Sequence, residues 1–182
     1  MHPSPEELKF SRAESLIVET LRKGRPFDRE FTGNDFSMLV RGGLSTYADA
    51  LEQRRGVKLS IMDVKTPIRE GRVLVTSSGQ AQKRVAPGIW TPSIAYELSA
   101  GIRQDTKPGR LFVPDFDFEP DSFFGIDIRG RVAPHIEGDA INDLLFEGLQ
   151  FGLRAKGVDL TYLGFRMQPE TIFVRARGGP AR

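Results

Sequence analysis

Residues 139–157 read DAINDLLFEGLQFGLRAKG, and their pattern predicts a long amphipathic helix that covers one face of a sheet. An aspartate begins the segment and a glycine ends it, as is typical of helix boundaries. Apolar residues recur at helical spacing and form one stripe, which we expect to be buried: Ile141, Leu144, Leu145, Leu149 and Leu153.

Two glycines, Gly148 and Gly152, lie four residues apart inside this predicted helix. A glycine in a helix interior costs about 1 kcal/mol relative to alanine, so the pattern indicates a close approach on that face. We favour packing against the sheet of the same chain. The alternative is a helix contact between subunits, and the candidate interface residues are then Gly148 and Gly152 together with Phe116 and Phe118 of the preceding segment.

The segments on both sides of this helix have the patterns of strands. After it, residues 158–167 and 171–177 predict a closing hairpin, and 178–182 a flexible tail. Before it, residues 111–118 and 123–132 predict two further strands, because apolar and polar residues alternate along them.

Alternation also predicts a β-hairpin near residues 57–75, with its turn at 69–72. Residues 77–87, SSGQAQKRVAP, are polar and basic without periodicity and predict an exposed loop. Residues 91–98 fit either a strand or a short helix, and the pattern leaves both open.

The first third of the chain has helical patterns. Ser4 and Glu7 have capping-box spacing ahead of a predicted helix that ends near Lys23 and Gly24. Two shorter helices are predicted at 34–42 and 45–55, separated at Gly42 and Gly43.

This order predicts an α+β fold, with N-terminal helices followed by a mainly antiparallel sheet and one long amphipathic helix packed on it. We expect a helical region at 1–56, a sheet region at 57–177 that forms one compact domain with it, and the tail at 178–182.

The composition excludes several classes of protein. The 182 residues include no Cys and two His, so disulfide frameworks and thiolate metal sites are excluded. No apolar stretch approaches the roughly 20 residues of a membrane-spanning helix, and MHPSPEELKF lacks the pattern of a secretory signal. We therefore expect a cytoplasmic or particle-associated protein with no membrane partner.

The formal net charge of +2 conceals two opposed blocks. Residues 54–114 carry eleven Lys and Arg against four Asp and Glu, whereas 115–147 carry two against nine. These blocks are either solvated faces that compensate each other within the fold, or complementary surfaces for docking between copies or onto a partner.

Carboxylates in the acidic block are candidate ligands for a divalent cation, namely Asp115, Asp117 and Asp127. Asp115, Asp127 and Arg129 resemble in part the Pro-Asp and Asp/Glu-x-Lys arrangement of metal-dependent nucleases, which implies a metal-dependent hydrolase. Arg129 stands where that family has lysine, and arginine is a poor general base.

Basic residues interleaved with an aromatic residue are candidate contacts for nucleic acid. They are Arg54, Arg55, Lys58, Lys83, Arg84, Trp90, Arg175 and Arg177.

No phosphate-binding loop, dinucleotide fingerprint or nucleophile elbow is present, so we predict no catalytic residues and no cofactor. We interpret His135 as part of the approach to the long helix. The leading hypothesis is a non-enzymatic assembly or adaptor protein, or a structural subunit of a phage, secretion or similar particle, with a protein partner or self-association. The alternative is a nucleic-acid-binding protein that uses the basic 54–110 block and the C-terminal arginines, and the least favoured is a hydrolase at the 115–129 carboxylates.

Overall fold

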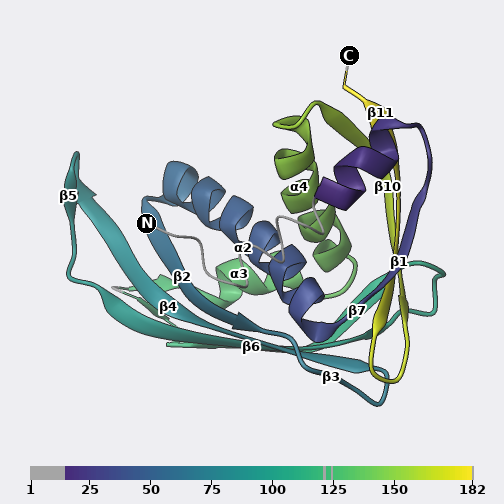
Figure 1. Ribbon diagram of the computed structural model, residues 1–182. Coiled ribbons are helices and arrows are strands. Elements are labelled where there is room, and N and C mark those ends of the chain that lie inside the picture. Colours follow the sequence, from purple (N-terminus) through teal and green to yellow (C-terminus); the bar gives the residue numbers. More distant parts are fainter. Residues whose placement is uncertain (1–14, 121, 124, 182) are drawn as a thin grey trace.

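Two antiparallel sheets carry most of the strands of the computed structural model, which describes residues 15–120, 122–123 and 125–181 (Figure 1). Helices fill the space between the two sheets (Figure 1). The expected mixed class with antiparallel sheets is therefore confirmed. Within the described ranges, no helix has both the length and the apolar content needed to cross a membrane.

The large sheet has the strand order β2-β4-β6-β7, and two short strands pair with β4. Its strands are β2 (Val57–Lys65), β3 (Ile68–Arg69), β4 (Arg72–Ala86), β5 (Ile89–Trp90), β6 (Ile94–Gln104) and β7 (Leu111–Glu119). The predicted turn at 69–72 is confirmed, because Arg69 pairs with Arg72 across Glu70 and Gly71. Both turn residues have positive φ, 51° and 70°, as a type I′ hairpin requires.

The loop predicted at 77–87 is wrong, because β4 continues through it to Ala86. Its inward positions there are Ser77, Gly79 and Ala81, which are small and therefore gave no apolar signal. The ring of Tyr96 covers Gly79, its partner on β6, and a Cβ on that glycine would lie 2.8 Å from the ring. The open alternative at 91–98 is resolved as a strand from Ile94 onward.

The small sheet has the order β1-β11-β10, so a strand from the first third of the chain pairs with a strand of the C-terminal hairpin. Its strands are β1 (Phe27–Phe31), β10 (Val158–Met167) and β11 (Ile172–Pro180). The predicted C-terminal hairpin is confirmed. Residues 178–180, expected in a flexible tail, instead pair with the start of β10. Strand β1 lies within 1–56, so that region is not wholly helical.

Helix α2 (Gly33–Arg55) is one continuous helix, so the break predicted at Gly42 and Gly43 is wrong. Thr32 and Asp35 form a capping box at its start, and Gly56 ends it in the left-handed conformation. The first predicted helix is helical at residues 15–22, where Ile17 and Leu21 are buried, and its earlier part lies outside the described residues.

The single strand predicted at 123–132 is also wrong. Two short strands, β8 (Ser122–Phe123) and β9 (Ile126–Asp127), are followed by helix α3 (Arg129–Ile136). The Asp127 carboxylate accepts a hydrogen bond of 2.7 Å from the N–H of Gly130 and so stabilises the first turn. Ile128, Val132 and Ile136 lie four residues apart and are all buried, as a helix allows.

Helix α4 (Ala140–Arg154) crosses α2 at a contact between backbones. A Cβ on Gly148 would lie 2.5 Å from the Gly43 nitrogen, 2.6 Å from its Cα and 2.8 Å from the Gly42 carbonyl carbon. Gly148 therefore faces another helix of the same chain, not the sheet as we favoured. Neither glycine breaks α2, and Gly43 permits the close crossing, since a Cβ there would lie 3.1 Å from the Leu144 carbonyl oxygen.

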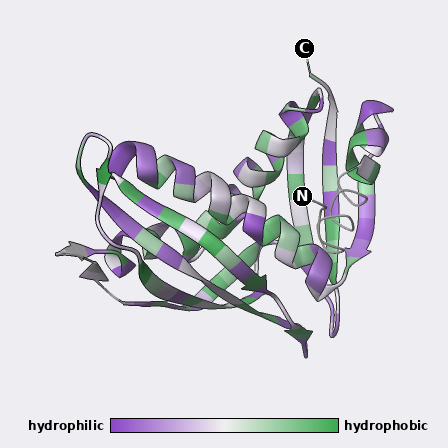
Figure 2. Cartoon of the chain, turned by 60° about the vertical axis from the view of Figure 1, so that its left-hand side comes forward, coloured by the Kyte–Doolittle hydropathy of each residue, from purple (hydrophilic) through white to green (hydrophobic). Residues whose placement is uncertain are grey.

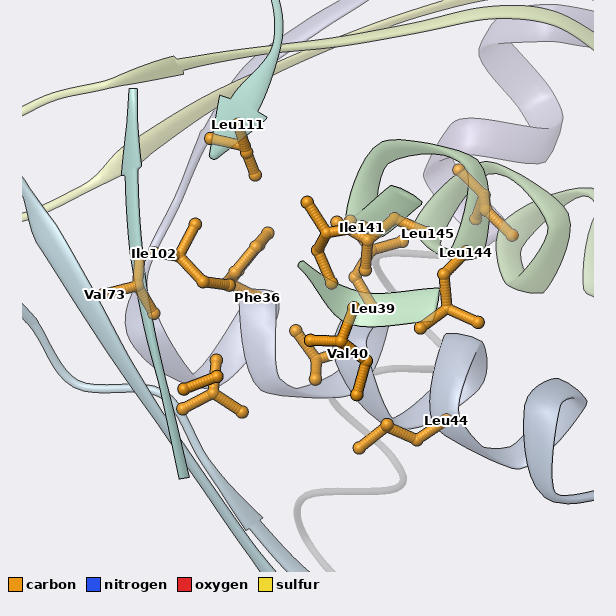
Figure 3. Close-up of a cluster of buried hydrophobic side chains, with 14 of the residues drawn as sticks. Phe36, Leu39, Val40, Leu44, Val73, Ile102, Leu111, Ile141, Leu144 and Leu145 are labelled. Carbon is orange, nitrogen blue, oxygen red and sulfur yellow. The ribbon is translucent and has the colours of Figure 1, made fainter. Parts of the chain in front are cut away.

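One buried cluster joins the helices to the inner face of the large sheet (Figure 3). Phe36, Leu39, Val40 and Leu44 of α2 and Ile141, Leu144 and Leu145 of α4 meet Val73, Ile102 and Leu111 of the strands. The helices therefore pack on one face of the large sheet.

We expect Gly148→Ala to lower the free energy of unfolding by about 1–3 kcal/mol, because the added methyl group meets backbone atoms that cannot rotate away. The matched control is Gly42→Ala. No atom lies within 4 Å of a Cβ at Gly42, so this change should stabilise the helix by up to about 1 kcal/mol. Urea unfolding of both variants measures the two effects, and equal changes would contradict the proposed crossing.

Candidate functional site

Carboxylates gather on the outer face of the large sheet, opposite the core. Figure 2 shows hydrophilic and hydrophobic residues alternating along its long strands, as expected for a sheet with one buried face. One row across the sheet pairs Asp63 with Ser78, Ser78 with Glu97, and Glu97 with Glu119. We call Asp63, Glu97, Asp117 and Glu119 the acidic band, and they line a shallow hollow of about 330 Å³.

Glu97 and Glu119 lie directly opposite each other on β6 and β7. Like charges in such a cross-strand pair repel and destabilise the sheet. The other two carboxylates have cationic neighbours. The Asp63 carboxylate lies 3.1 Å from the Lys65 ammonium nitrogen, and the Asp117 carboxylate lies 3.9 Å from a guanidinium nitrogen of Arg129. The acidic band therefore holds two opposed glutamates whose repulsion a cationic partner would relieve.

The predicted metal ligands do not converge. Asp115 and Asp117 lie on β7, whereas Asp127 ends β9 and accepts a hydrogen bond from the N–H of Gly130. No three His, Asp or Glu side chains in the described part of the chain are close enough to hold a metal ion. The structure therefore does not form the predicted divalent-cation site.

Six of the eight candidate nucleic-acid contacts lie at one end of the large sheet. Arg54 and Arg55 end α2, and Lys58 follows at the start of β2. Strand β4 brings Lys83 opposite Val57 and Arg84 opposite Trp90 of β5. We call Lys58, Lys83, Arg84 and Trp90 the basic end.

Within the basic end, the Arg84 guanidinium lies 4.9 Å from the centre of the Trp90 ring, a cation–π contact. The hairpin between β4 and β5 also exposes two large apolar side chains, Val85 at 60% and Ile89 at 58%. The basic end therefore combines cations with apolar contact area.

Arg175 and Arg177 lie elsewhere, on β11 of the small sheet, at the opposite end of the molecule from β5 (Figure 1). Arg175 binds Asp28 at 2.8 Å, and this hydrogen bond raises the pKa of the arginine. Arg177 lies 5.8 Å from the centre of the Tyr162 ring. The two arginines are therefore not part of the basic end.

The candidate interface residues lie largely inside the chain. Phe116 and Phe118 are buried, and the Phe118 ring stacks on Tyr96 with centres 5.3 Å apart. Gly148 is buried against α2, whereas Gly152 borders a small apolar groove between α2 and α4. The two phenylalanines and Gly148 thus serve the core instead of a surface.

A cleft of about 550 Å³ lies between α2, α3 and α4, and the sequence analysis did not predict it. Tyr47 and His135 face each other in it, with ring centres 5.0 Å apart, and the Tyr47 hydroxyl donates a hydrogen bond of 3.2 Å to the Arg131 carbonyl. Burial raises the pKa of Tyr47, although the charges of Arg131 and Arg55 oppose this rise. The four-residue spacing of Ile128, Val132 and Ile136 was the available signal for α3 and hence for this cleft.

We expect Glu97→Gln to raise the free energy of unfolding by about 0.2–1 kcal/mol, because it removes the repulsion from Glu119. The gain should shrink at about 1 M salt, where charges are screened. Glu30→Gln is the matched control, since the residue opposite Glu30 is Phe173. Thermal unfolding at both salt concentrations tests the pair, and a loss of stability in Glu97→Gln would contradict the repulsion.

Comparison with known proteins identifies no family. No family model matches the chain, and no curated protein matches it. A solved structure titled "Crystal structure of lipopolysaccharide binding protein" is similar at 11% sequence identity and a TM-score of 0.24. The match covers 86% of this chain and 41% of that chain, so this chain spans less than half of its length. A similarity at this TM-score supports no conclusion about fold or function.

Proposed function

We propose that this chain is a non-enzymatic assembly subunit whose copies join head to tail, with the basic end of one copy on the acidic band of the next. The observation that carries the proposal is the separation of opposite charges along one sheet. Ser78 of the acidic row and Arg84 of the basic end lie six residues apart on β4. This spacing corresponds to about 20 Å along a strand.

Two different patches that bind each other make a heterologous contact. Each added copy leaves one free patch of each kind, so the contact closes a ring or extends a filament. A symmetric dimer would need one patch that complements itself, and neither the acidic band nor the basic end has that character.

The energetics also favour this contact. Lys58 and Arg84 of a neighbouring copy would relieve the repulsion between Glu97 and Glu119. Val85, Ile89 and Trp90 would supply the apolar and aromatic area that typically carries binding energy. Charge would then set the register and the association rate.

A charge-swap experiment tests this contact. We expect the wild type to form large species at about 50 mM salt that dissociate as salt screens the charges. A band variant, Glu97→Lys with Glu119→Lys, and an end variant, Lys58→Glu with Arg84→Glu, should each be monomeric. An equimolar mixture should assemble again, because each reversed patch then meets a patch of opposite charge.

Sedimentation velocity measures all of these species. The control is Arg29→Glu on β1, an exposed residue of the small sheet that should leave assembly unchanged. A wild type that stays monomeric at about 50 mM salt, or a mixture that fails to assemble, would overturn the head-to-tail contact.

A second candidate function is nucleic-acid binding at the basic end, favoured by the contact of Arg84 with Trp90 and by the position of Lys58 and Lys83 at the same end of the sheet. Cations that contact phosphates beside an aromatic ring that stacks on bases are typical of single-strand binding. The acidic band lies on the same sheet and would repel a polyanion, so we rank this function second.

Fluorescence anisotropy with a labelled single-stranded oligonucleotide tests this second function. We expect Lys83→Ala with Arg84→Ala to weaken binding at least about tenfold and to reduce its salt dependence. Arg175→Ala with Arg177→Ala should change little, because these arginines lie on the other sheet. Absence of binding at about 50 mM salt would exclude the function.

A further inference from the structure

We propose that the cleft between α2, α3 and α4 binds a small zwitterion, a free α-amino acid with a large apolar side chain. Its volume of about 550 Å³ is within the usual range for small-molecule sites. The cleft shares no lining residue with the acidic band or the basic end, so the inference does not depend on the proposed assembly.

One wall of the cleft is cationic. Arg54 and Arg55 come from the last turn of α2, and Arg131 comes from α3. Among the described residues, none of these guanidinium groups has an ion pair. Arginine binds carboxylates through two parallel hydrogen bonds, so this wall suits the carboxylate of an amino acid.

The part of the lining that α4 supplies is anionic. Asp143 and Glu147 lie one turn apart on α4 and both line the cleft. Neither carboxylate forms an ion pair with a cation of the described chain. An ammonium group donates three hydrogen bonds and is the natural complement of two neighbouring carboxylates. A zwitterion complements both kinds of charge in this lining, whereas a simple anion or a simple cation complements only one.

Flat and apolar side chains complete the cleft. The Tyr47 and His135 rings are tilted by 41° to each other with centres 5.0 Å apart. Leu51 and Leu144 add aliphatic surface to the lining. The ligand's side chain packs against these groups, while the ammonium and carboxylate groups on its α carbon fix its orientation.

Calorimetry with three probes that differ by one charged group tests this site. L-phenylalanine carries both charges, 3-phenylpropionate lacks the ammonium group, and 2-phenylethylamine lacks the carboxylate. We expect each truncated probe to bind the full chain at least about tenfold more weakly than phenylalanine, since each loses charged hydrogen bonds.

Two variants assign the walls. Arg131→Gln should weaken the binding of phenylalanine about tenfold and leave the binding of 2-phenylethylamine, which has no carboxylate, unchanged. Glu147→Gln should also weaken the binding of phenylalanine about tenfold, and it should leave the binding of 3-phenylpropionate, which has no ammonium group, unchanged. Arg103→Gln on β6, outside the cleft, is the control. The Tm of each variant without ligand checks its fold, and Arg131→Lys replaces Arg131→Gln if the latter unfolds.

Two results would overturn the inference. One is the absence of heat and of any Tm shift with all twenty L-amino acids at millimolar concentration. The other is equal affinity for the three phenyl probes, which would show that the charged walls do not select a zwitterion.

Discussion

The backbone contact between Gly43 and Gly148 sets the distance between α2 and α4, and the arrangement of both sheets depends on it. Helix α2 connects β1 of the small sheet to β2 of the large sheet, and α4 leads directly into β10. A side chain at this crossing would separate the helices and displace the strands attached to them. The same crossing brings Asp143 and Glu147 of α4 and the arginines that end α2 into the lining of one cleft.

Local patterns predicted those parts of the fold whose apolar residues are large. The stripe from Ile141 to Leu153 is an example. The part of β4 from residue 77 onward was missed because Ser77, Gly79 and Ala81 face the core, where the Tyr96 ring on the neighbouring strand covers Gly79. A large side chain that packs over a small residue of the neighbouring strand cannot be predicted before the register of the two strands is known.

The candidate site was predictable only where neighbours in sequence are also neighbours in space. Arg84 and Trp90 meet because a short hairpin joins their strands. The opposition of Glu97 and Glu119 needs the register of β6 against β7, which no local pattern contains. The cleft needs α3, and alternation around Ile126 and Ile128 concealed the helix that follows.

Trp90 is the only tryptophan of the chain, and its ring is in contact with the Arg84 guanidinium. The intrinsic indole fluorescence of the protein therefore comes entirely from one end of one sheet. Any molecule that draws Arg84 away from the ring, or covers the ring itself, should change this emission. Occupation of the distant small sheet should leave it unchanged. The native chain thus carries its own optical reporter, without an added label, for events at the β4–β5 hairpin.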